Sequence, residues 1–262
     1  MPITHQTVYS ETQGATSWDG ISLADGKMFD DFMVNEVAPR LHDDSGKADF
    51  ASHLNSLAST GFAQDSLRII LEAEQPEERD WAVGEAMAEV WLSHTHGVVW
   101  PWNMERDKRT PKASLPGADL VGFITKGAET RLALGEVKCS SDSNTPPNVM
   151  YGRSGMTQQL EDLATDLGLL YTLIRWLQPR CRGNSAEQPF NAAIKLLLES
   201  GNKALTLFGV LVRDTQPHES DLRNRGLHLG GIVTAPSACQ LLALYLPCPI
   251  ASLPARVKGG VA

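Results

Sequence analysis

Residues 116–138 decide the fold, and they read PGADLVGFITKGAETRLALGEVK. Two runs rich in apolar and β-branched side chains flank a short segment, KGAE, that contains Gly127. Because glycine adopts the backbone angles that a tight turn needs, this pattern predicts an antiparallel β-hairpin. The stretch should therefore supply two neighbouring strands of a sheet.

The expected register of this hairpin gathers three charged side chains. A loop centred on Gly127 and Ala128 places Asp119 opposite Glu136. Side chains alternate between the two faces of a strand, so Lys138 shares the face of Glu136. Two carboxylates and a lysine then converge. The same register pairs Phe123 with Leu132 and Val121 with Leu134.

Two carboxylates that face each other need a physical reason, because like charges directly opposite destabilise a sheet. A divalent cation supplies one. Mg²⁺, or Mn²⁺, prefers oxygen ligands and often takes one or two protein carboxylates, with water and substrate phosphate as the other ligands. Lys138 cannot ligate while charged, but it can orient or deprotonate a water and stabilise charge on a phosphate. These residues predict metal-assisted phosphodiester hydrolysis.

The residues of the hairpin also carry a family resemblance. Pro116-Gly117-Ala118-Asp119 followed by Glu136-Val137-Lys138 resembles the signature of the PD-(D/E)XK nuclease superfamily, which has the restriction-endonuclease-like fold. The resemblance spans residues 80–180 and implies that Asp119 and Glu136 hold the metal, that the Val137 carbonyl adds a ligand, and that Lys138 serves the water. The sequence departs from the signature where two residues separate the proline from the aspartate.

The context of the motif is similar to a narrower group. A helix with Gly84-Glu85 precedes the hairpin, and together they resemble the nuclease subunit of Hachiman-type anti-phage systems. This implies a role in phage defence beside a helicase-type ATPase partner. In the resembled fold, a helix glutamate at the position of Glu85 reaches the metal directly or through water. A glutamine after the Glu-x-Lys strand, here Gln159, would support the site.

Each of these residues also has an ordinary structural explanation. Alternating charges such as Glu136 and Lys138 often decorate the wet face of a sheet. Glu85, like Glu89 one turn later, can simply face water, and a glutamine such as Gln159 is common at a helix N-terminus. The preceding aspartate, the Pro-Gly opening and the upstream helix favour a site.

Charge limits how the chain meets nucleic acid. The 262 residues carry a formal net charge of −8, which argues against broad non-specific binding because phosphate contacts depend on Lys and Arg. A nuclease with this balance needs a local basic patch or a partner that brings the DNA. The best local cluster directly precedes the hairpin, and we expect it to contact phosphate unless it is a solvated charge run: Arg106, Lys108, Arg109 and Lys112.

The remaining composition indicates a soluble cytoplasmic protein. Hydrophobic residues make up 42% and charged residues 21%, which is ordinary for a globular chain. The four cysteines are widely spaced, which fits reduced thiols. Residues 1–5 lack the basic and apolar regions of a signal peptide, and no run reaches the roughly 20 apolar residues of a membrane span. His94 and His96 have no third ligand at zinc spacing, so a metal site there is disfavoured.

The order of patterns along the chain predicts an α/β or α+β fold, with a mixed central sheet flanked by helices. We expect a mainly helical addition over residues 1–79 and a nuclease-like core over 80–262. The helical patterns cover 29–41, 50–57, 77–92, one long helix 157–177, and 185–201 with a Ser185/Gln188 capping box; the strand patterns cover 98–102, 204–212 and 227–233; segments 67–71 and 237–246 fit either; residues 1–27 read as a strand and loop or as disorder.

The sequence therefore favours a Mg²⁺-dependent DNA nuclease with Asp119, Glu136 and Lys138 at its centre. Two alternatives stay open: a degenerate nuclease fold that acts as a binding or regulatory subunit, and a stand-alone restriction endonuclease. The choice between DNA and RNA, the specificity of cutting and the formation of a homo-oligomer are left open by the sequence.

Overall fold

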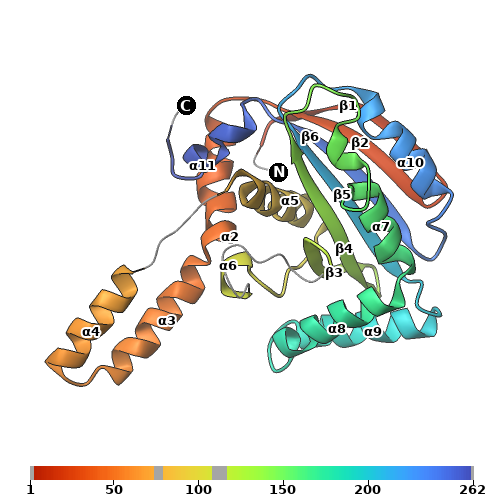
Figure 1. Ribbon diagram of the computed structural model, residues 1–262. Coiled ribbons are helices and arrows are strands. Elements are labelled where there is room, and N and C mark those ends of the chain that lie inside the picture. Colours follow the sequence, from red (N-terminus) through yellow and green to blue (C-terminus); the bar gives the residue numbers. More distant parts are fainter. Residues whose placement is uncertain (1–2, 74–78, 108–116, 261–262) are drawn as a thin grey trace.

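A computed structural model describes residues 3–73, 79–107 and 117–260, and it has the α/β architecture that the sequence predicts. Figure 1 shows a twisted six-stranded sheet with helices on both faces, and the strand order is β1-β2-β6-β5-β4-β3. The strands are β1 (His5–Gln13), β2 (Thr16–Leu23), β3 (Leu120–Lys126), β4 (Glu129–Ser140), β5 (Leu205–Arg213) and β6 (Ala238–Tyr245).

The sheet is mixed. β2, β6, β5 and β4 run parallel to one another, whereas the edge strands β1 and β3 are antiparallel to their neighbours. All nine residues of β5 are buried, as expected for an apolar strand at the centre of a sheet covered on both faces. The polar strand β1 is mostly exposed at the opposite edge from β3. The prediction of a central strand at residues 204–212 is confirmed.

The register of the β3–β4 hairpin is the predicted one. Val121 pairs with Leu134 and Phe123 with Leu132, and the ladder closes at Lys126 opposite Glu129. One further contact holds the outer strand, because Val99 forms an isolated antiparallel bridge to Phe123. The stretch 98–102 is thus a single bridge in place of the expected short strand.

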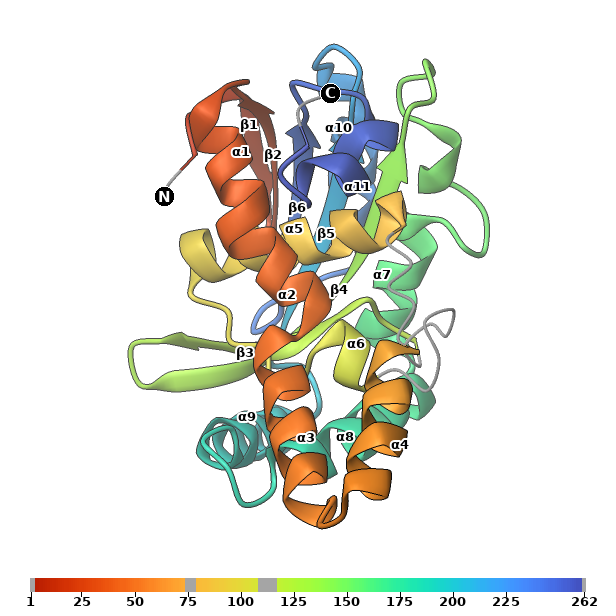
Figure 2. The ribbon, with the colours of Figure 1, turned by 90° about the vertical axis from the view of Figure 1, so that its left-hand side faces the viewer.

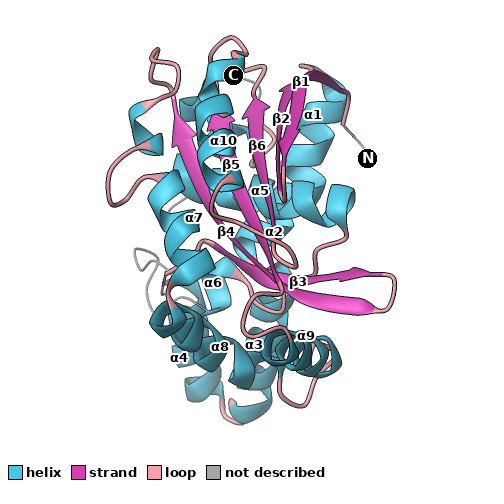
Figure 3. Cartoon of the chain, turned by 90° about the vertical axis from the view of Figure 1, so that its right-hand side faces the viewer, coloured by secondary structure: helices cyan, strands magenta, loops and turns pink. Residues whose placement is uncertain are grey.

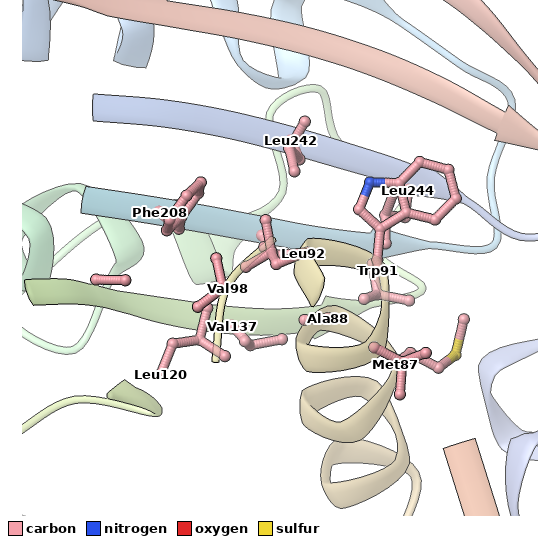
Figure 4. Packing of buried hydrophobic residues seen from close by; sticks show 14 of the residues in the cluster. Met87, Ala88, Trp91, Leu92, Val98, Leu120, Val137, Phe208, Leu242 and Leu244 are labelled. Carbon is pink, nitrogen blue, oxygen red and sulfur yellow. The ribbon is translucent and has the colours of Figure 1, made fainter. Parts of the chain in front are cut away.

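The first helical layer covers one face of the sheet and is centred on α5 (Asp80–His96). Residues 82–92 of this helix are all buried, so it is enclosed by other elements on all sides. Figure 4 shows Leu92 and Ala88 pointing toward Val137 of β4 and Phe208 of β5. Figure 2 looks onto the outer helices of this layer: α1 (Lys27–Phe32), η1 (Met33–Val37), α2 (Ala38–His42) and α11 (Leu253–Arg256).

The opposite face carries α7 (Met156–Thr165) and α10 (Arg223–Gly230), which lie side by side in front of the sheet in Figure 3. Below them lie α8 (Leu167–Cys181) and α9 (Glu187–Glu199), the latter packed on β4. On the other side, α3 (Asp44–Leu57) and α4 (Gly61–Glu72) project as a helical hairpin (Figure 1), and α3 buries none of its residues. The remaining short helices are α6 (Met104–Asp107), η2 (Asn148–Met150), η3 (Glu219–Asp221) and η4 (Ile250–Ser252).

Three further local predictions are wrong. The expected strand 227–233 is mostly helix α10, because Leu222, Gly226 and Leu229 recur at helical spacing and bury one face against the sheet. The single helix expected over 157–177 is two helices, since the Asp166 side chain accepts hydrogen bonds from the amides of Gly168 and Leu169 and starts α8 anew.

The third correction concerns the start of α9. The predicted capping box between Ser185 and Gln188 does not form, and the helix begins after Ala186 without a side-chain cap. Asn184 orders this corner instead, because its side-chain oxygen accepts from the amide of Ala186 at 2.9 Å. The sequence correctly indicated that a helix begins here, but its spacing pointed to Ser185, whereas Asn184 orders the start of the helix.

The ambiguous segments resolve as follows. Residues 67–71 belong to α4, residues 238–245 form β6, and residues 5–23 form the β1–β2 hairpin. Residues 1–79 therefore include two strands of the central sheet as well as helices, while their folding as a separate addition stays a prediction. Within the described ranges, no helix has the length and apolar character needed to cross a membrane.

Candidate functional site

The candidate site lies where β3 begins beside β4. β3 starts at Leu120, opposite Gly135, so the next residues of β4 have no β3 partner in the ladder. Asp119 fills this position in two ways: its amide donates to the Gly135 carbonyl at 3.0 Å, and its Oδ2 accepts from the Val137 amide at 3.0 Å. The aspartate is therefore held beside Glu136 by the hydrogen-bonding pattern of the strand edge.

Glu136 is an acid of this group whose pKa departs strongly from its ordinary value. Its side chain is buried, and one oxygen, Oε1, accepts from the Lys138 ammonium at 2.6 Å. The other oxygen, Oε2, is buried with no hydrogen-bond partner. Burial and then the Asp119 charge raise the pKa of Glu136 to about 8, although Lys138 acts in the opposite direction. The protein thus keeps a carboxyl group where its ionised form is poorly satisfied.

The two faces of the sheet differ at this point. In β5, Phe208 contacts the ring of His96 from α5, whereas the neighbouring Gly209 lies under α7. Glu136 pairs with Gly209 and Lys138 with Leu211, so both side chains are on the α7 face. The three residues Asp119, Glu136 and Lys138 are therefore brought together by register, as the sequence predicts.

Gly209 is a site-shaping residue that the sequence reasoning missed. A Cβ there would lie 2.8 Å from Leu160 Cδ1 and 2.9 Å from Met156 Sδ, both on α7. The absent side chain lets this helix pack closely beside Glu136. The signal was available, since a glycine inside a buried strand often marks the close approach of another element.

Gln159 lies on α7 beside Leu160, the residue that packs over Gly209. Its Oε1 is buried and has no hydrogen-bond partner, so this glutamine faces inward at a polar position. No hydrogen bond joins it to Glu136 or Lys138, and its supporting role stays a prediction. Because α7 covers the face of the sheet that carries Glu136 and Lys138, Gln159 lies on the same side of the sheet as these two residues.

Glu85 approaches β4 from the opposite face. Gly84 packs against Cys139, and the Glu85 charge helps raise the pKa of that thiol to about 12, after the larger effect of burial. Glu85 and Glu89 are both buried, so the alternative that they face water is wrong. Glu89 pairs with Arg40. A metal contact by Glu85 stays a prediction.

The basic cluster expected before the hairpin is only partly described. Lys108, Arg109 and Lys112 lie outside the described residues. Arg106 is half exposed and forms ion pairs with Asp43 at 3.4 Å and Asp107 at 3.2 Å, so its charge is already balanced. The contact of this cluster with phosphate stays a prediction.

The two histidines have separate partners. His94 pairs with Glu36, whereas His96 packs edge-on against Phe208. Burial lowers the pKa of His96, which favours its neutral form. In the part of the chain that the structure describes, no three or more His, Cys, Asp or Glu side chains form a group suited to a metal ion.

The donor set at the hairpin nevertheless fits a hard cation. Asp119 and Glu136 offer two carboxylates, and Mg²⁺ commonly uses one or two such ligands and completes its shell with water and substrate phosphate. A cation would also satisfy the buried Glu136 Oε2 and favour its ionised form. The Val137 carbonyl belongs to the same stretch of β4 as a further oxygen.

Comparisons with known proteins add no family. Neither the protein-family models nor the curated proteins contain a match to this sequence.

Proposed function

We propose that the protein is a Mg²⁺-dependent nuclease that hydrolyses phosphodiester bonds of DNA. The supporting observation is that Asp119 lies at the strand edge beside Glu136, that Glu136 and Lys138 share one face of β4, and that a buried Glu136 oxygen has no partner. A carboxyl group with a raised pKa beside a second acid and a lysine is typical of functional sites.

The roles of the residues follow from their contacts. Asp119 and Glu136 would hold the cation, with the Val137 carbonyl as a third ligand. A bound Mg²⁺ ion polarises phosphate oxygens and acidifies water. Lys138 presents an ammonium group at the Glu136 carboxylate, where it can orient a water and stabilise negative charge on phosphate. Glu136 must lose its proton to ligate, so metal binding is coupled to proton release.

The wider context of the proposal comes from the resemblance to Hachiman-type nuclease subunits. We infer a cytoplasmic effector of phage defence whose helicase-type partner brings DNA to the site. Gln159 and Glu85 would act in support, from α7 and α5 respectively. The strongly negative chain suits this division of labour, since the partner can supply the positive surface that DNA binding needs.

A second candidate function is a binding or regulatory subunit with a degenerate nuclease fold. It is favoured by the absence, within the described residues, of a cluster of three acidic, histidine or cysteine side chains. The catalytic proposal is preferred because Lys138 is present and positioned. A protein that binds neither Mg²⁺ nor Mn²⁺ would favour the binding subunit, whereas a preferred cleavage sequence would indicate a restriction endonuclease.

The test is cleavage of supercoiled plasmid with Mg²⁺ and with Mn²⁺. Glu136→Ala and Lys138→Ala should each lower the rate at least about 100-fold, because one removes a metal ligand and the other a charge at the reacting group. Lys126→Ala is the matched control, since this exposed lysine ends β3 at the far side of the same hairpin.

Two outcomes would contradict the proposal. A Lys138→Ala protein that melts at the wild-type temperature and cleaves at the wild-type rate would exclude the catalytic role of the lysine. If the wild type is inert, the assay is repeated with the copurified partner. Inertness of that complex would exclude a nuclease and leave the binding subunit.

A further inference from the structure

A cavity of about 540 Å³ opens on the α7 side of the sheet, between α7, α10 and the loop after η2. Figure 3 shows these two helices next to each other on that face. The cavity is separate from the charged group on the hairpin, and its lining is polar and rich in cationic side chains. The residues that matter here are Tyr151, Arg153, Glu161, Asn224, Arg225 and His228.

Arg225 is the central cation of this cavity. Its guanidinium lies over the Tyr151 ring, 4.6 Å from the centroid. Its Nε is buried and has no hydrogen-bond partner. A stacked arginine with a buried donor that has no partner can bind a planar or anionic ligand.

The charges around Arg225 are not balanced by neighbouring acids. Arg153, also in the cavity lining, is exposed, and among the described residues neither arginine forms an ion pair. Arg223 on the same helix does pair, with Glu219 at 3.0 Å. The acid within the cavity, Glu161, pairs with His228. Two guanidinium groups therefore remain to interact with a ligand.

The walls of the cavity are held by contacts within the protein. Glu161 of α7 and His228 of α10 link the two helices. The loop is closed by the Gly155 amide, which donates to the Gly152 carbonyl at 3.0 Å, and it is joined to α7 by the Thr157 hydroxyl, which donates to the Met150 carbonyl at 3.2 Å. The cationic groups are thus presented from ordered elements.

The chemistry of the lining selects a phosphate group. Guanidinium groups recognise phosphate through paired N–H donors, and the exposed Asn224 amide provides a further donor in the same lining. A divalent cation would be repelled by the two arginines, and an apolar ligand would leave their donors unsatisfied. In a chain of net charge −8, such a local concentration of positive charge is a specific feature.

The position of the cavity relates it to nucleic acid. Leu160 on the inner side of α7 packs over Gly209, the strand neighbour of Glu136, and Glu161 lines the cavity. The two places are therefore on one side of the sheet and separated by about one helix diameter, roughly 10 Å. Base pairs rise by about 3.4 Å along each strand, so a duplex that follows this face from the hairpin would reach the cavity within a few base pairs.

We propose that the cavity between α7 and α10 binds a backbone phosphate of the DNA substrate, with Arg225 and Arg153 as its main contacts. This inference rests on the proposed nuclease function. The two arginines would supply the local basic patch that this acidic chain requires to bind nucleic acid. The proposal also predicts that the substrate crosses α7 on its way to Glu136 and Lys138.

The experiment measures binding of a fluorescently labelled DNA duplex by the full chain in EDTA, over a series of salt concentrations. Arg225→Gln and Arg153→Gln should each weaken binding about fivefold and reduce the slope of log K against log salt by about one, because each removes one phosphate contact. Arg182→Gln is the control, since this exposed arginine ends α8, far from α10.

Three results separate the possibilities. If folded Arg225→Gln binds the duplex with wild-type affinity and slope, the proposal is overturned. It is also overturned if calorimetry shows that Arg225→Gln loses binding of inorganic phosphate alone while duplex binding is unchanged, which would make the cavity a small-anion site. If both variants bind the duplex more weakly and with a smaller salt slope, the phosphate site in the cavity is supported. If, in addition, neither the wild type nor its partner complex cleaves plasmid with Mn²⁺, the nuclease function is contradicted.

Discussion

At the scale of single residues, Glu136 is the unusual feature of this protein. Most buried carboxyl groups are fully hydrogen-bonded, but here one oxygen has Lys138 and the other has no partner. Asp119 adds a second negative charge nearby. Such an arrangement costs stability in the free protein, and we expect that this cost is relieved when the site binds its cation.

The raised pKa of Glu136 predicts a dependence of stability on pH. The pKa of Glu136 is about 8 in the folded protein and 4.5 ordinarily. Below pH 4.5 the carboxyl group is protonated in both the folded and the unfolded protein, so it does not change the free energy of unfolding. As the pH rises from 4.5 to 8, the unfolded chain releases the proton first, and the free energy of unfolding falls. Glu136→Gln has no titrating group at this position. Over the same pH range its metal-free melting temperature should therefore fall on the order of 5 °C less than that of the wild type.

The measurement is thermal melting of both proteins in EDTA between pH 5 and pH 8. Added Mg²⁺ should raise the melting temperature of the wild type at pH 8 and leave that of Glu136→Gln nearly unchanged, because the ion binds the ionised carboxylate. Parallel curves for the two proteins, with and without Mg²⁺, would show that Glu136 is neither strained nor a ligand.

At the scale of elements, the distance between α7 and the sheet sets the shape of both proposed sites. Gly209 allows Met156 and Leu160 to approach the strand beside Glu136, and the other side of α7 contributes Glu161 to the cavity with Arg225. A change at one glycine should therefore be felt on both sides of the helix. Packed helices move as rigid units more readily than they deform.

Gly209→Ala tests this packing. Its Cβ would lie 2.7 to 2.9 Å from three side-chain atoms, so Leu160, Met156 and Leu241 must shift, at a cost of about 1 to 3 kcal/mol. Gly61→Ala is the control, because nothing lies within 4 Å of that position at the start of α4, and it should stabilise by about 0.5 kcal/mol. Urea unfolding measures both, and equal effects would contradict the close packing.

At the scale of the whole molecule, a buried polar network ties together three strands of the sheet and the loop that follows β4. Arg213 at the end of β5 lies 3.4 Å from Asp221 of η3 and donates to the Asn144 carbonyl at 3.1 Å. Tyr245 of β6 is 2.9 Å from both Asp221 Oδ2 and the Tyr9 hydroxyl of β1. The carbonyl at Asn144 belongs to the loop that follows β4.

Removing one member of this network should be costly. Arg213 and Asp221 are fully buried, so Asp221→Ala leaves an unpaired guanidinium inside the protein and should lower the free energy of unfolding by about 3 to 5 kcal/mol. Glu219→Ala, two residues earlier, breaks only the exposed pair with Arg223 and should cost less than about 1 kcal/mol. Denaturant titration compares them; similar losses would show that the network is not a structural tie.

The sequence by itself determined the hairpin and its register. Period-two alternation and the turn at Gly127 are local properties, so they predicted that Asp119, Glu136 and Lys138 share a face. The continuous apolar run of residues 204–212 likewise identified the central strand. By contrast, Leu227–Val233 was misassigned because a short apolar run with glycines fits a strand or a helix equally well until its packing partner is known.

Only the tertiary structure decided what those residues face. The burial of Glu136, the close approach of α7 over Gly209, and the pairing of Glu89 with Arg40 depend on contacts between segments far apart in the chain. The cavity around Arg225 also depends on such contacts, since Tyr151, Glu161 and His228 come together only when α7 and α10 pack on one sheet. A sequence specifies local periodicity directly, whereas burial and charge balance are set by neighbours that folding brings near.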